Sequence, residues 1–267
     1  MPNLAEKFHA LHDSDDILVL PNAWDVGSAK VIEDAGAKAI ATSSAGVAWA
    51  LGFPDGNILP PKILAELTSR ITDVLKIPLT IDFEGGYTNN PSKIGDTLAP
   101  VIDAGAVGIN IEDGEGAPDL LAKKIEKARK AAEKAGVNVF INARTDVFLA
   151  EIGSPKSRVA ETIKRSECYE AAGANGLFVP GLSDADEIRA IASGIKIPLN
   201  VMTVPGLPKA RELEKLGVRR LTSGQTIPQV VWKTVALLAK KFLETGDAKV
   251  VTTDTMPYSN LQDLFKR

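Results

Sequence analysis

The sequence predicts an α/β fold, a single (β/α)8 TIM barrel with an N-terminal leading helix and a C-terminal helical tail. Short β-branched runs alternate with amphipathic runs of helical length from Ile17 to Gly246, a rhythm typical of βα units. Helix-to-strand junctions repeat one phrase, as in residues 34–37 (Asp-Ala-Gly-Ala), with glycine at the left-handed position that ends a helix. The length of 267 residues suits one barrel, so we expect residues 1–267 to form one domain with its core at about 17–246.

Each predicted strand is followed by one predicted helix, and no linker interrupts the alternation. The expected strands are Ile17–Pro21, Ala39–Ser43, Pro78–Phe83, Gly108–Glu112, Asn138–Ala143, Gly176–Val179, Pro198–Met202 and Arg220–Thr222. The expected helices are Val26–Ala35, Lys62–Leu75, Ser92–Ala104, Leu120–Ala135, Lys156–Ala172, Ala185–Ala192, Leu207–Leu216 and Ile227–Leu243.

Two segments lie outside the barrel. Asn3–Leu11 is predicted to be a short leading helix, and residues 247–267 form a tail that carries Leu261, Leu264 and Phe265. An amphipathic tail usually packs on another surface. We expect this tail to contact a neighbouring subunit.

Composition excludes several classes of protein. The 31 basic and 34 acidic residues give a net charge of -3 with no basic stripe, so nucleic acid is not an expected partner. The single cysteine, Cys168, rules out an internal disulfide and agrees with a reducing compartment. Without an apolar leader or a spanning segment, we expect a cytoplasmic protein that does not bind a membrane.

Reactive side chains gather where the second to fifth strands end, which is where barrel enzymes build their active sites. Asp82 and Glu84 are one residue apart on an extended strand, so their side chains leave the same face, and Glu112 reaches that space from the next strand. Crowded carboxylates without histidine or thiol favour Mg²⁺, with Mn²⁺ as the alternative. The alternative is a purely structural role, in which these acids cap helices or lie in solvated loops.

Two further groups complete the predicted site. Arg144 ends the fifth strand, where its guanidinium could hold a substrate carboxylate or stabilise an enolate oxygen. Its alternative role is a structural ion pair with Asp82 or Glu112. Ser43, Ser44 and Ala45 begin a small polar turn whose backbone N–H groups could bind an anion.

The chain resembles the isocitrate lyase and phosphoenolpyruvate mutase superfamily, within it the phosphoenolpyruvate mutase-like branch. The resemblance runs from about Leu20 to Gly246 and rests on motifs in order: residues 20–25 (Leu-Pro-Asn-Ala-Trp-Asp), Thr42-Ser43-Ser44 with Ala50-Leu51-Gly52 and Asp55, residues 82–87 (Asp-Phe-Glu-Gly-Gly-Tyr), residues 108–113 (Gly-Ile-Asn-Ile-Glu-Asp) and Ala143-Arg144. It implies a homo-oligomer, a dimer or tetramer.

The resemblance also implies roles for the site residues. Asp82, Glu84 and Glu112 would hold Mg²⁺ directly or through water. The backbone of Ser43, Ser44 and Ala45 would bind the carboxylate of a pyruvate-like 2-oxo acid beside Asp82. Asp55 would approach the substrate or a metal-bound water, and Arg144 would stabilise the enolate, which makes Arg144, Asp55 and Glu112 the candidate catalytic residues.

The chain departs from the family at two places. The lyases carry a Lys-Lys-Cys-Gly-His loop after the fourth strand, where this chain has Gly-Glu-Gly-Ala-Pro at 114–118, and the mutases have a histidine where Pro180 stands. His9 and His12, the only histidines, belong to the leading helix, which we expect to be a surface helix. No general base is assigned, although Tyr87, Glu115 and Asp146 are available.

We therefore predict a Mg²⁺-dependent lyase that cleaves a C–C bond of a small 2-oxo or 2-hydroxy carboxylate through a metal-stabilised enolate. One alternative is a mutase or hydrolase that acts on the C–P bond of phosphonopyruvate or phosphoenolpyruvate. Another is a barrel that binds a 2-oxo acid without chemistry. A phosphate site at residues 222–224 (Thr-Ser-Gly) is the remaining alternative.

Overall fold

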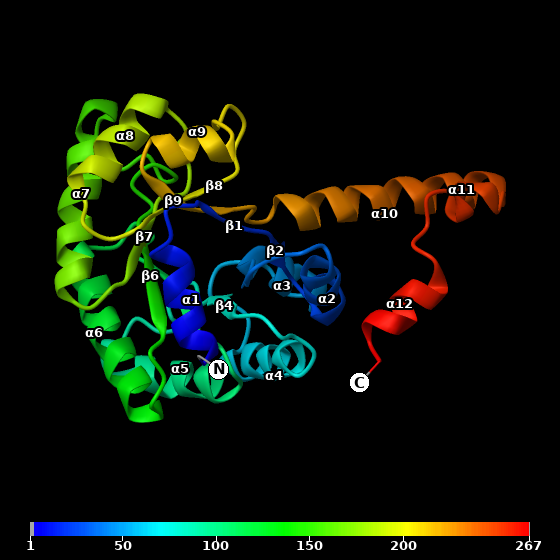
Figure 1. Ribbon diagram of the computed structural model, residues 1–267, viewed down its shortest axis with the longest axis horizontal. Helices are drawn as coiled ribbons and strands as arrows, with labels where there is room; N and C mark the ends of the chain where they lie inside the picture. Colours follow the sequence, from blue (N-terminus) through cyan, green and yellow to red (C-terminus); the bar gives the residue numbers. More distant parts are fainter. Residues whose placement is uncertain (1–2, 267) are drawn as a thin grey trace.

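Parallel strands close into a barrel in the computed structural model, which describes residues 3–266 (Figure 1). The sheet order is β1-β9-β8-β7-β6-β5-β4-β3-β2. β1 (Leu18–Leu20) pairs with β9 (Val218–Thr222), and β2 (Asn22–Ala23) pairs with β3 (Ile40–Thr42). β1 and β2 are two parts of one strand interrupted at Pro21, whose missing N–H cannot join a ladder. The predicted TIM barrel is therefore confirmed.

The remaining strands follow the predicted ranges closely. They are β4 (Leu79–Asp82), β5 (Gly108–Glu112), β6 (Phe140–Arg144), β7 (Gly176–Phe178) and β8 (Leu199–Met202). The register pairs Asp82 with Asn110, and Glu112 with Arg144. The carboxyl ends of β4, β5 and β6 thus bring the predicted acids and the arginine to one end of the barrel.

Helices surround the sheet. They are α2 (Val26–Asp34), α3 (Ser44–Ala50), α4 (Pro61–Thr72), α5 (Ile94–Asp103) after the short η1 (Pro91–Lys93), α6 (Pro118–Ala135), α7 (Pro155–Ala171), α8 (Ala185–Gly194) and α9 (Ala210–Lys215). Leu64, Leu98 and Ile188 are examples of helix residues buried in the one large core between helices and strands. α3 has no counterpart among the predicted helices.

α1 (Leu4–His12) closes the barrel at the amino ends of the strands. Phe8 is fully buried there, and its ring contacts the ring of Phe140 edge-on. His12 stacks on Phe140 and is only 3% exposed, so the expectation of a surface helix is wrong for this residue. Burial and the nearby Arg220 guanidinium lower the pKa of His12 to about 3.

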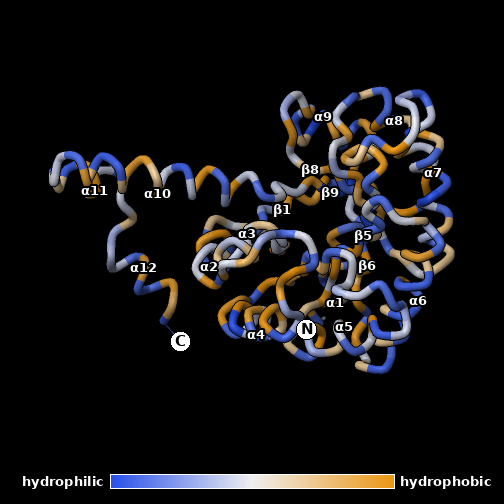
Figure 2. Tube along the Cα trace, turned by 180° about the vertical axis from the view of Figure 1, so that it is seen from behind, coloured by the Kyte–Doolittle hydropathy of each residue, from blue (hydrophilic) through white to orange (hydrophobic). Residues whose placement is uncertain are grey.

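α10 (Thr226–Thr245) does not cover its own barrel. Figure 1 shows it projecting away from the strands, and Pro228 is its one buried residue. Its exposed apolar residues are Val230, Val231, Trp232, Val235, Leu237, Leu238, Phe242 and Leu243. Hydrophobic segments recur along the isolated helix in Figure 2. The predicted eighth helix exists, but the position that it would fill between α9 and α2 stays open.

The tail consists of α11 (Lys249–Thr252) and α12 (Tyr258–Leu264). α12 turns back and contacts α2 of the same chain, while Leu261 and Phe265 remain exposed. Met1, Pro2 and Arg267, the ends of the predicted domain, lie outside the described residues. Within residues 3–266 no helix is both long and apolar enough to cross a membrane.

Candidate active site

A cavity of about 260 Å³ opens at the carboxyl ends of the strands. It is lined by Asn22, Ser43, Ser44, Ala45, Trp49, Asp55, Asp82, Asn110, Arg144, Leu149, Phe178, Pro180, Met202, Thr222, Gly224, Gln225 and Gln229. Six of the predicted site residues are in this set: Ser43, Ser44, Ala45, Asp55, Asp82 and Arg144. Glu84 and Glu112 lie beside the cavity and do not line it.

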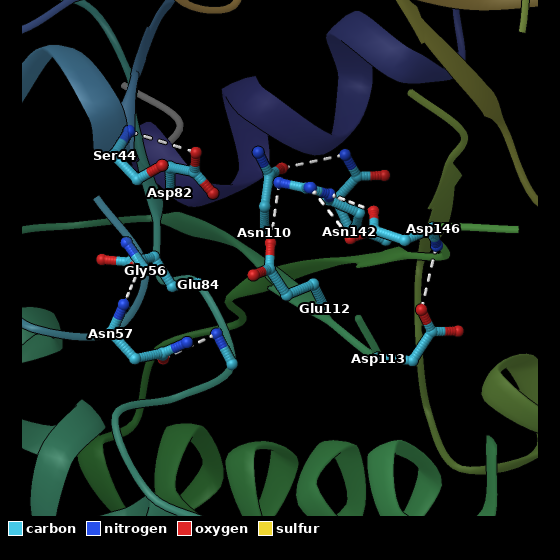
Figure 3. Close-up of polar contacts among 12 residues, drawn as sticks. Ser44, Gly56, Asn57, Asp82, Glu84, Asn110, Glu112, Asp113, Asn142 and Asp146 are labelled. Atoms are coloured by element: carbon cyan, nitrogen blue, oxygen red, sulfur yellow. Dashed lines mark hydrogen bonds and ion pairs between the residues drawn. The ribbon is translucent and has the colours of Figure 1, made fainter. Parts of the chain in front are cut away.

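The turn after β3 starts a helix, and this helix fixes Asp82. Ser43 caps α3, and the Ser44 N–H donates to Asp82 Oδ2 at 3.2 Å (Figure 3). The Asp82 N–H in turn donates to Thr42 Oγ1 at 2.8 Å. The Ala45 N–H has no acceptor within the described part of the chain, so it is free to bind an anion at the first turn of α3.

Glu84 points toward the loop that carries Asp55. Its Oε2 accepts the backbone N–H groups of Gly56 and Asn57, and its Oε1 accepts the Tyr87 hydroxyl at 2.8 Å. Burial raises the pKa of Glu84 although these donors oppose the rise. Both oxygens of Glu84 thus bind the loop 51–60 and Tyr87.

The side chain of Asn57, in the loop, forms hydrogen bonds with the backbone just after β4. Its Oδ1 accepts the N–H groups of Gly85 at 2.9 Å and Tyr87 at 3.2 Å. Asn57, Glu84 and Tyr87 have φ angles of 61°, 47° and 57°, in the left-handed region that non-glycine residues rarely adopt. We call this arrangement the Glu84–Asn57 clamp. It attaches the Asp55 loop to the strand that carries Asp82.

Arg144 lies between two carboxylates. Its Nη1 is 2.7 Å from Glu112 Oε2, and its Nε and Nη2 donate to Asp146 Oδ1 and Oδ2 at 2.6 and 3.0 Å. Burial raises the pKa of Glu112 to about 8, with Arg144 opposing the rise and Asp82 adding to it. Burial alone would lower the pKa of Arg144, but Glu112 and Asp146 together raise it. The ion-pair alternative for Arg144 is thus realised with Glu112.

A second tier of residues supports Asp146. The Asp146 N–H donates to Asp113 Oδ1 at 2.9 Å, as Figure 3 shows. Asp113 Oδ2 accepts from Arg165 Nη1 at 2.7 Å and from the Tyr169 hydroxyl. Arg165 and Tyr169 were not among the predicted site residues, because their position on α7 reveals no link to the end of β5. The spacing of Arg144 and Asp146 on one strand did offer a signal for their pairing.

The donor set suits Mg²⁺. Asp82 Oδ1 is buried with no hydrogen-bond partner, which leaves one carboxylate oxygen available at the cavity. Burial is the largest cause of the raised pKa values of Asp55, Glu84 and Glu112, and repulsion by the Asp82 carboxylate is a further cause. A bound cation would relieve this repulsion between carboxylates. Within residues 3–266, no three His, Cys, Asp or Glu side chains are grouped so that together they could hold a metal ion. Mg²⁺ usually binds one or two carboxylates and keeps several waters, so an open site fits it.

The turn at residues 222–224 is used by the barrel itself. The Gly224 N–H donates to Asn22 Oδ1 at 2.8 Å, and Ser223 Oγ accepts the Asn22 N–H at 2.8 Å. These bonds join β9 to β2 across the closure of the barrel. The phosphate site considered for this turn would require donors that are already occupied.

The fold and this acidic pocket define a TIM-barrel enzyme class that works on small molecules at the strand ends. The family model described as phosphoenolpyruvate phosphomutase matches residues 8–243, so the chain belongs to the phosphoenolpyruvate mutase family. The resemblance found in the motifs is confirmed.

Three curated relatives cover most of the chain. An uncharacterized protein of Mycobacterium tuberculosis is 35% identical over 96% of this chain and 95% of its own length. Oxaloacetate decarboxylase 1 of Pseudomonas fluorescens is 29% identical over 83% of this chain and 78% of its own length. A 2-methylisocitrate lyase of Bacillus subtilis is 26% identical over 97% of this chain and 88% of its own length, so the named curated relatives are enzymes.

Solved structures agree. A Burkholderia cenocepacia protein provisionally named a phosphonomutase is 42% identical, with a TM-score of 0.84 over 89% of this chain and 99% of its own. A phosphonopyruvate hydrolase in complex with oxalate and Mg²⁺ has the same fold, with 23% identity and a TM-score of 0.86 over 98% of this chain and 95% of its own. That hydrolase binds Mg²⁺ together with a small carboxylate, oxalate.

Proposed function

We propose that the protein is a Mg²⁺-dependent lyase that cleaves a C–C bond of a small 2-oxo or 2-hydroxy carboxylate. The observation that carries the proposal is the unpartnered Oδ1 of Asp82 in a small cavity that also holds the Arg144 guanidinium. An available carboxylate oxygen and a fixed cation are what an enolate-forming reaction requires of its site.

Different residues of the site bind the substrate, stabilise the developing charge and transfer the proton. The backbone of Ser43, Ser44 and Ala45 binds the substrate carboxylate at the first turn of α3. Arg144, held by Asp146, faces the oxygen on which negative charge develops when the C–C bond breaks. Asp55, on the clamped loop, holds or delivers a proton at the reacting carbon. Glu112 keeps Arg144 in place from the other side.

Asp82 would hold the metal ion directly, and Glu84 and Glu112 would act through bound water, since neither lines the cavity. When bound, Mg²⁺ polarises the carbonyl group of the substrate as a Lewis acid, and Mn²⁺ is the alternative ion. The phosphonopyruvate hydrolase that binds oxalate and Mg²⁺ supports this assignment by its common fold.

A second candidate is cleavage or transfer at a C–P bond, which the 42% identity to the provisionally named phosphonomutase favours. The cavity lining argues against it. Arg144 is the one cationic side chain among the lining residues of the described chain, and Asp146 already neutralises it. A transferred phosphoryl group carries charge that several cationic groups normally stabilise. A barrel that only binds a 2-oxo acid is disfavoured because burying the Oδ1 atom of Asp82 without a partner costs stability.

The test is a screen for pyruvate or glyoxylate release from oxaloacetate, isocitrate and methylisocitrate with Mg²⁺ present. Asp82→Ala is compared with Asp186→Ala, an exposed acid of α8. We expect release with the parent protein and Asp186→Ala, and loss of at least a hundredfold in Asp82→Ala. Equal rates in both variants would contradict the role of Asp82. Turnover of phosphonopyruvate in a phosphorus NMR assay would favour the second candidate.

We also propose that the enzyme is a cytoplasmic homo-oligomer whose subunits exchange α10. The strand residue Val19 is 49% exposed on β1, next to the open position between α9 and α2, and α10 carries an uncovered apolar face. A second copy offers the matching helix, so a dimer satisfies both surfaces and a tetramer pairs two dimers. Light scattering of the parent and of Trp232→Glu tests this: we expect the variant to dissociate, and a monomeric parent protein would contradict the proposal.

A further inference from the structure

We infer that Asn110 is a substrate-binding residue, whose side-chain amide donates a hydrogen bond to an oxygen of the bound ligand, and that the buried Arg220 is its positioning residue. The inference rests on the proposed function, because it assumes that the cavity binds a 2-oxo acid or oxalate, its enolate mimic. Neither residue belongs to the site that the sequence predicts.

Asn110 lies where the cavity meets the interior of the barrel. In the register of the sheet it pairs with Asp82 on β4 and with Asn142 on β6, and Figure 3 shows it between these two residues. It lines the cavity although it is only 4% exposed. Within residues 3–266 its Oδ1 accepts two hydrogen bonds, whereas its Nδ2 donates none. The amide nitrogen is therefore available to donate to a ligand.

The orientation of the Asn110 amide follows from Arg220. The two ends of a side-chain amide have the same shape, so their hydrogen-bond partners decide which end is the oxygen. Arg220 Nη2 lies 3.3 Å from Asn110 Oδ1, and a guanidinium can only donate. The end of the amide that faces Arg220 must be the oxygen, which leaves the NH₂ group for the cavity.

Three asparagines inside the barrel share this polarity. Asn142 Nδ2 donates to Asn110 Oδ1 at 2.9 Å and to Asn200 Oδ1 at 3.0 Å. Asn200 Nδ2 in turn donates to the backbone oxygen of Val201 at 2.7 Å. If all three amides were reversed, Asn110 Nδ2 would face a guanidinium and Asn200 Oδ1 would face a carbonyl oxygen. All three residues are at most 4% exposed, and a satisfied network of buried amides is rigid.

Arg220 is buried at a cost that no ion pair offsets. It is 1% exposed, and its Nε and Nη1 have no hydrogen-bond partner within residues 3–266. Burial lowers the pKa of Arg220 to about 9, with Asp82 opposing the fall, so the guanidinium is charged at neutral pH. Buried ionic groups can be retained because they select one conformation. The conformation selected here is that of the Asn110 amide.

A neutral donor suits this place in the site. Asn110 stands beside Asp82, the carboxylate proposed to hold the metal ion. An ammonium or guanidinium group here would repel the cation, and a second carboxylate would repel the ligand. An amide N–H attracts the ligand oxygen without either effect. The hydrogen bond also strengthens as negative charge develops on that oxygen.

Calorimetry with Mg²⁺ alone, and with oxalate in the presence of Mg²⁺, tests the role of Asn110. Asn110→Asp keeps the shape but replaces the donor by an acceptor. We expect it to bind oxalate at least about tenfold more weakly, and to bind Mg²⁺ no more weakly, because the added carboxylate attracts the cation. Asn138→Asp adds the same charge at an exposed residue just before β6 and is the matched control, with both affinities unchanged.

Arg220→Met and Arg220→Lys test the positioning role. Without the guanidinium the amide of Asn110 can reverse, so we expect Arg220→Met to bind oxalate about threefold or more weakly. Its free energy of unfolding in urea should not fall, because an apolar side chain replaces an unpaired buried cation. Arg220→Lys supplies one donor again and should restore the affinity. Arg219→Met, on the other face of β9, is the control and binds oxalate like the parent protein.

The outcomes separate this inference from the proposed function. If the parent protein binds oxalate and Asn110→Asp binds it equally tightly, Asn110 does not donate to the ligand, so the inference is overturned and the proposed function stands. If Arg220→Met keeps the oxalate affinity, or loses stability and Mg²⁺ binding together with it, the positioning role of Arg220 is wrong. If the parent protein does not bind oxalate with Mg²⁺, the proposed function fails, and the inference fails with it.

Discussion

Arg144 and Asp146 form a two-bond pair, with Nε and Nη2 of the guanidinium donating to the two carboxylate oxygens at 2.6 and 3.0 Å. Two parallel charge-assisted bonds fix the plane of a guanidinium as well as its position. Because the Asp146 N–H donates to Asp113, this plane is anchored to α7 through Arg165 and Tyr169. Asp146 is therefore a positioning residue for Arg144.

The first prediction concerns that pair. Asp146→Asn removes one of the two acceptors while keeping the shape, so we expect oxalate to bind about tenfold more weakly, in line with the roughly 1.5–3 kcal/mol of a hydrogen bond to a charged group. Calorimetry with Mg²⁺ measures the effect. Asp186→Asn, which breaks the exposed pair with Arg189, is the control and leaves oxalate binding unchanged. Equal affinity for the Asp146 variant would show that Glu112 alone holds Arg144.

The second prediction concerns the Glu84–Asn57 clamp. Asn57→Gly tolerates the φ of 61° but removes the side-chain acceptor of the Gly85 and Tyr87 N–H groups. We expect faster hydrogen exchange at Gly85 and Tyr87 and a loss of about 1 kcal/mol in the free energy of unfolding. Hydrogen exchange read by mass spectrometry checks this. Unchanged protection of residues 84–87 would mean that the clamp does not hold the loop.

The third prediction concerns metal binding and pH. The pKa of Glu112 is raised from an ordinary 4.5 to about 8, so most of this carboxyl is protonated at neutral pH without a cation. Mg²⁺ must displace that proton, and the apparent Mg²⁺ affinity should rise by about tenfold per pH unit up to pH 8. Titrations at several pH values test this, and Glu112→Gln should give weaker binding that depends less on pH, because the carboxyls with raised pKa values that remain are Asp55 and Glu84. An affinity of the parent protein that is constant across this range would contradict the role of Glu112.

The fourth prediction concerns acid stability. The pKa of His12 is about 3 in the folded chain and 6.5 ordinarily, so between these values the unfolded chain binds more protons. The free energy of unfolding therefore falls as the pH drops below 6.5, by about 2 kcal/mol at pH 5 from this residue. His12→Gln, compared with His9→Gln, should flatten that dependence in urea denaturation. Identical slopes for both variants would contradict the burial of a neutral His12.

Much of the fold follows from local patterns. Alternating β-branched and amphipathic runs predicted the eight strand positions, and the strand-end acids predicted where the pocket lies. α3 was not predicted, because its small residues Ala45, Gly46 and Ala48 give no amphipathic pattern. Gly46 is small for a tertiary reason, since an added Cβ would lie 2.9 Å from Trp24 Cβ and 3.1 Å from Pro228 Cγ.

The missed features of the site depend on contacts between distant elements. The spacing of Asp82, Glu84 and Glu112 along their strands predicts that the three carboxylates share one site. In the structure Glu84 instead accepts hydrogen bonds from the backbone N–H groups of residues 56 and 57. No local pattern indicates that choice, because the loop 51–60 reaches β4 only in the folded chain. α10 poses the same problem, since an apolar face looks identical in sequence whether it covers its own barrel or another surface.

One continuous helix links the pocket to the apolar surface that we propose as the subunit interface. α10 begins with Gln225 and Gln229 at the cavity and continues into the exposed apolar segment around Trp232 and Leu238. If a second subunit immobilises that segment, it also sets the orientation of the two amides at the substrate. We therefore expect the activity per subunit to fall on dilution below the dissociation constant of the oligomer. The activity of each subunit would then depend on the concentration of the protein, and α10 would be the element that couples the two.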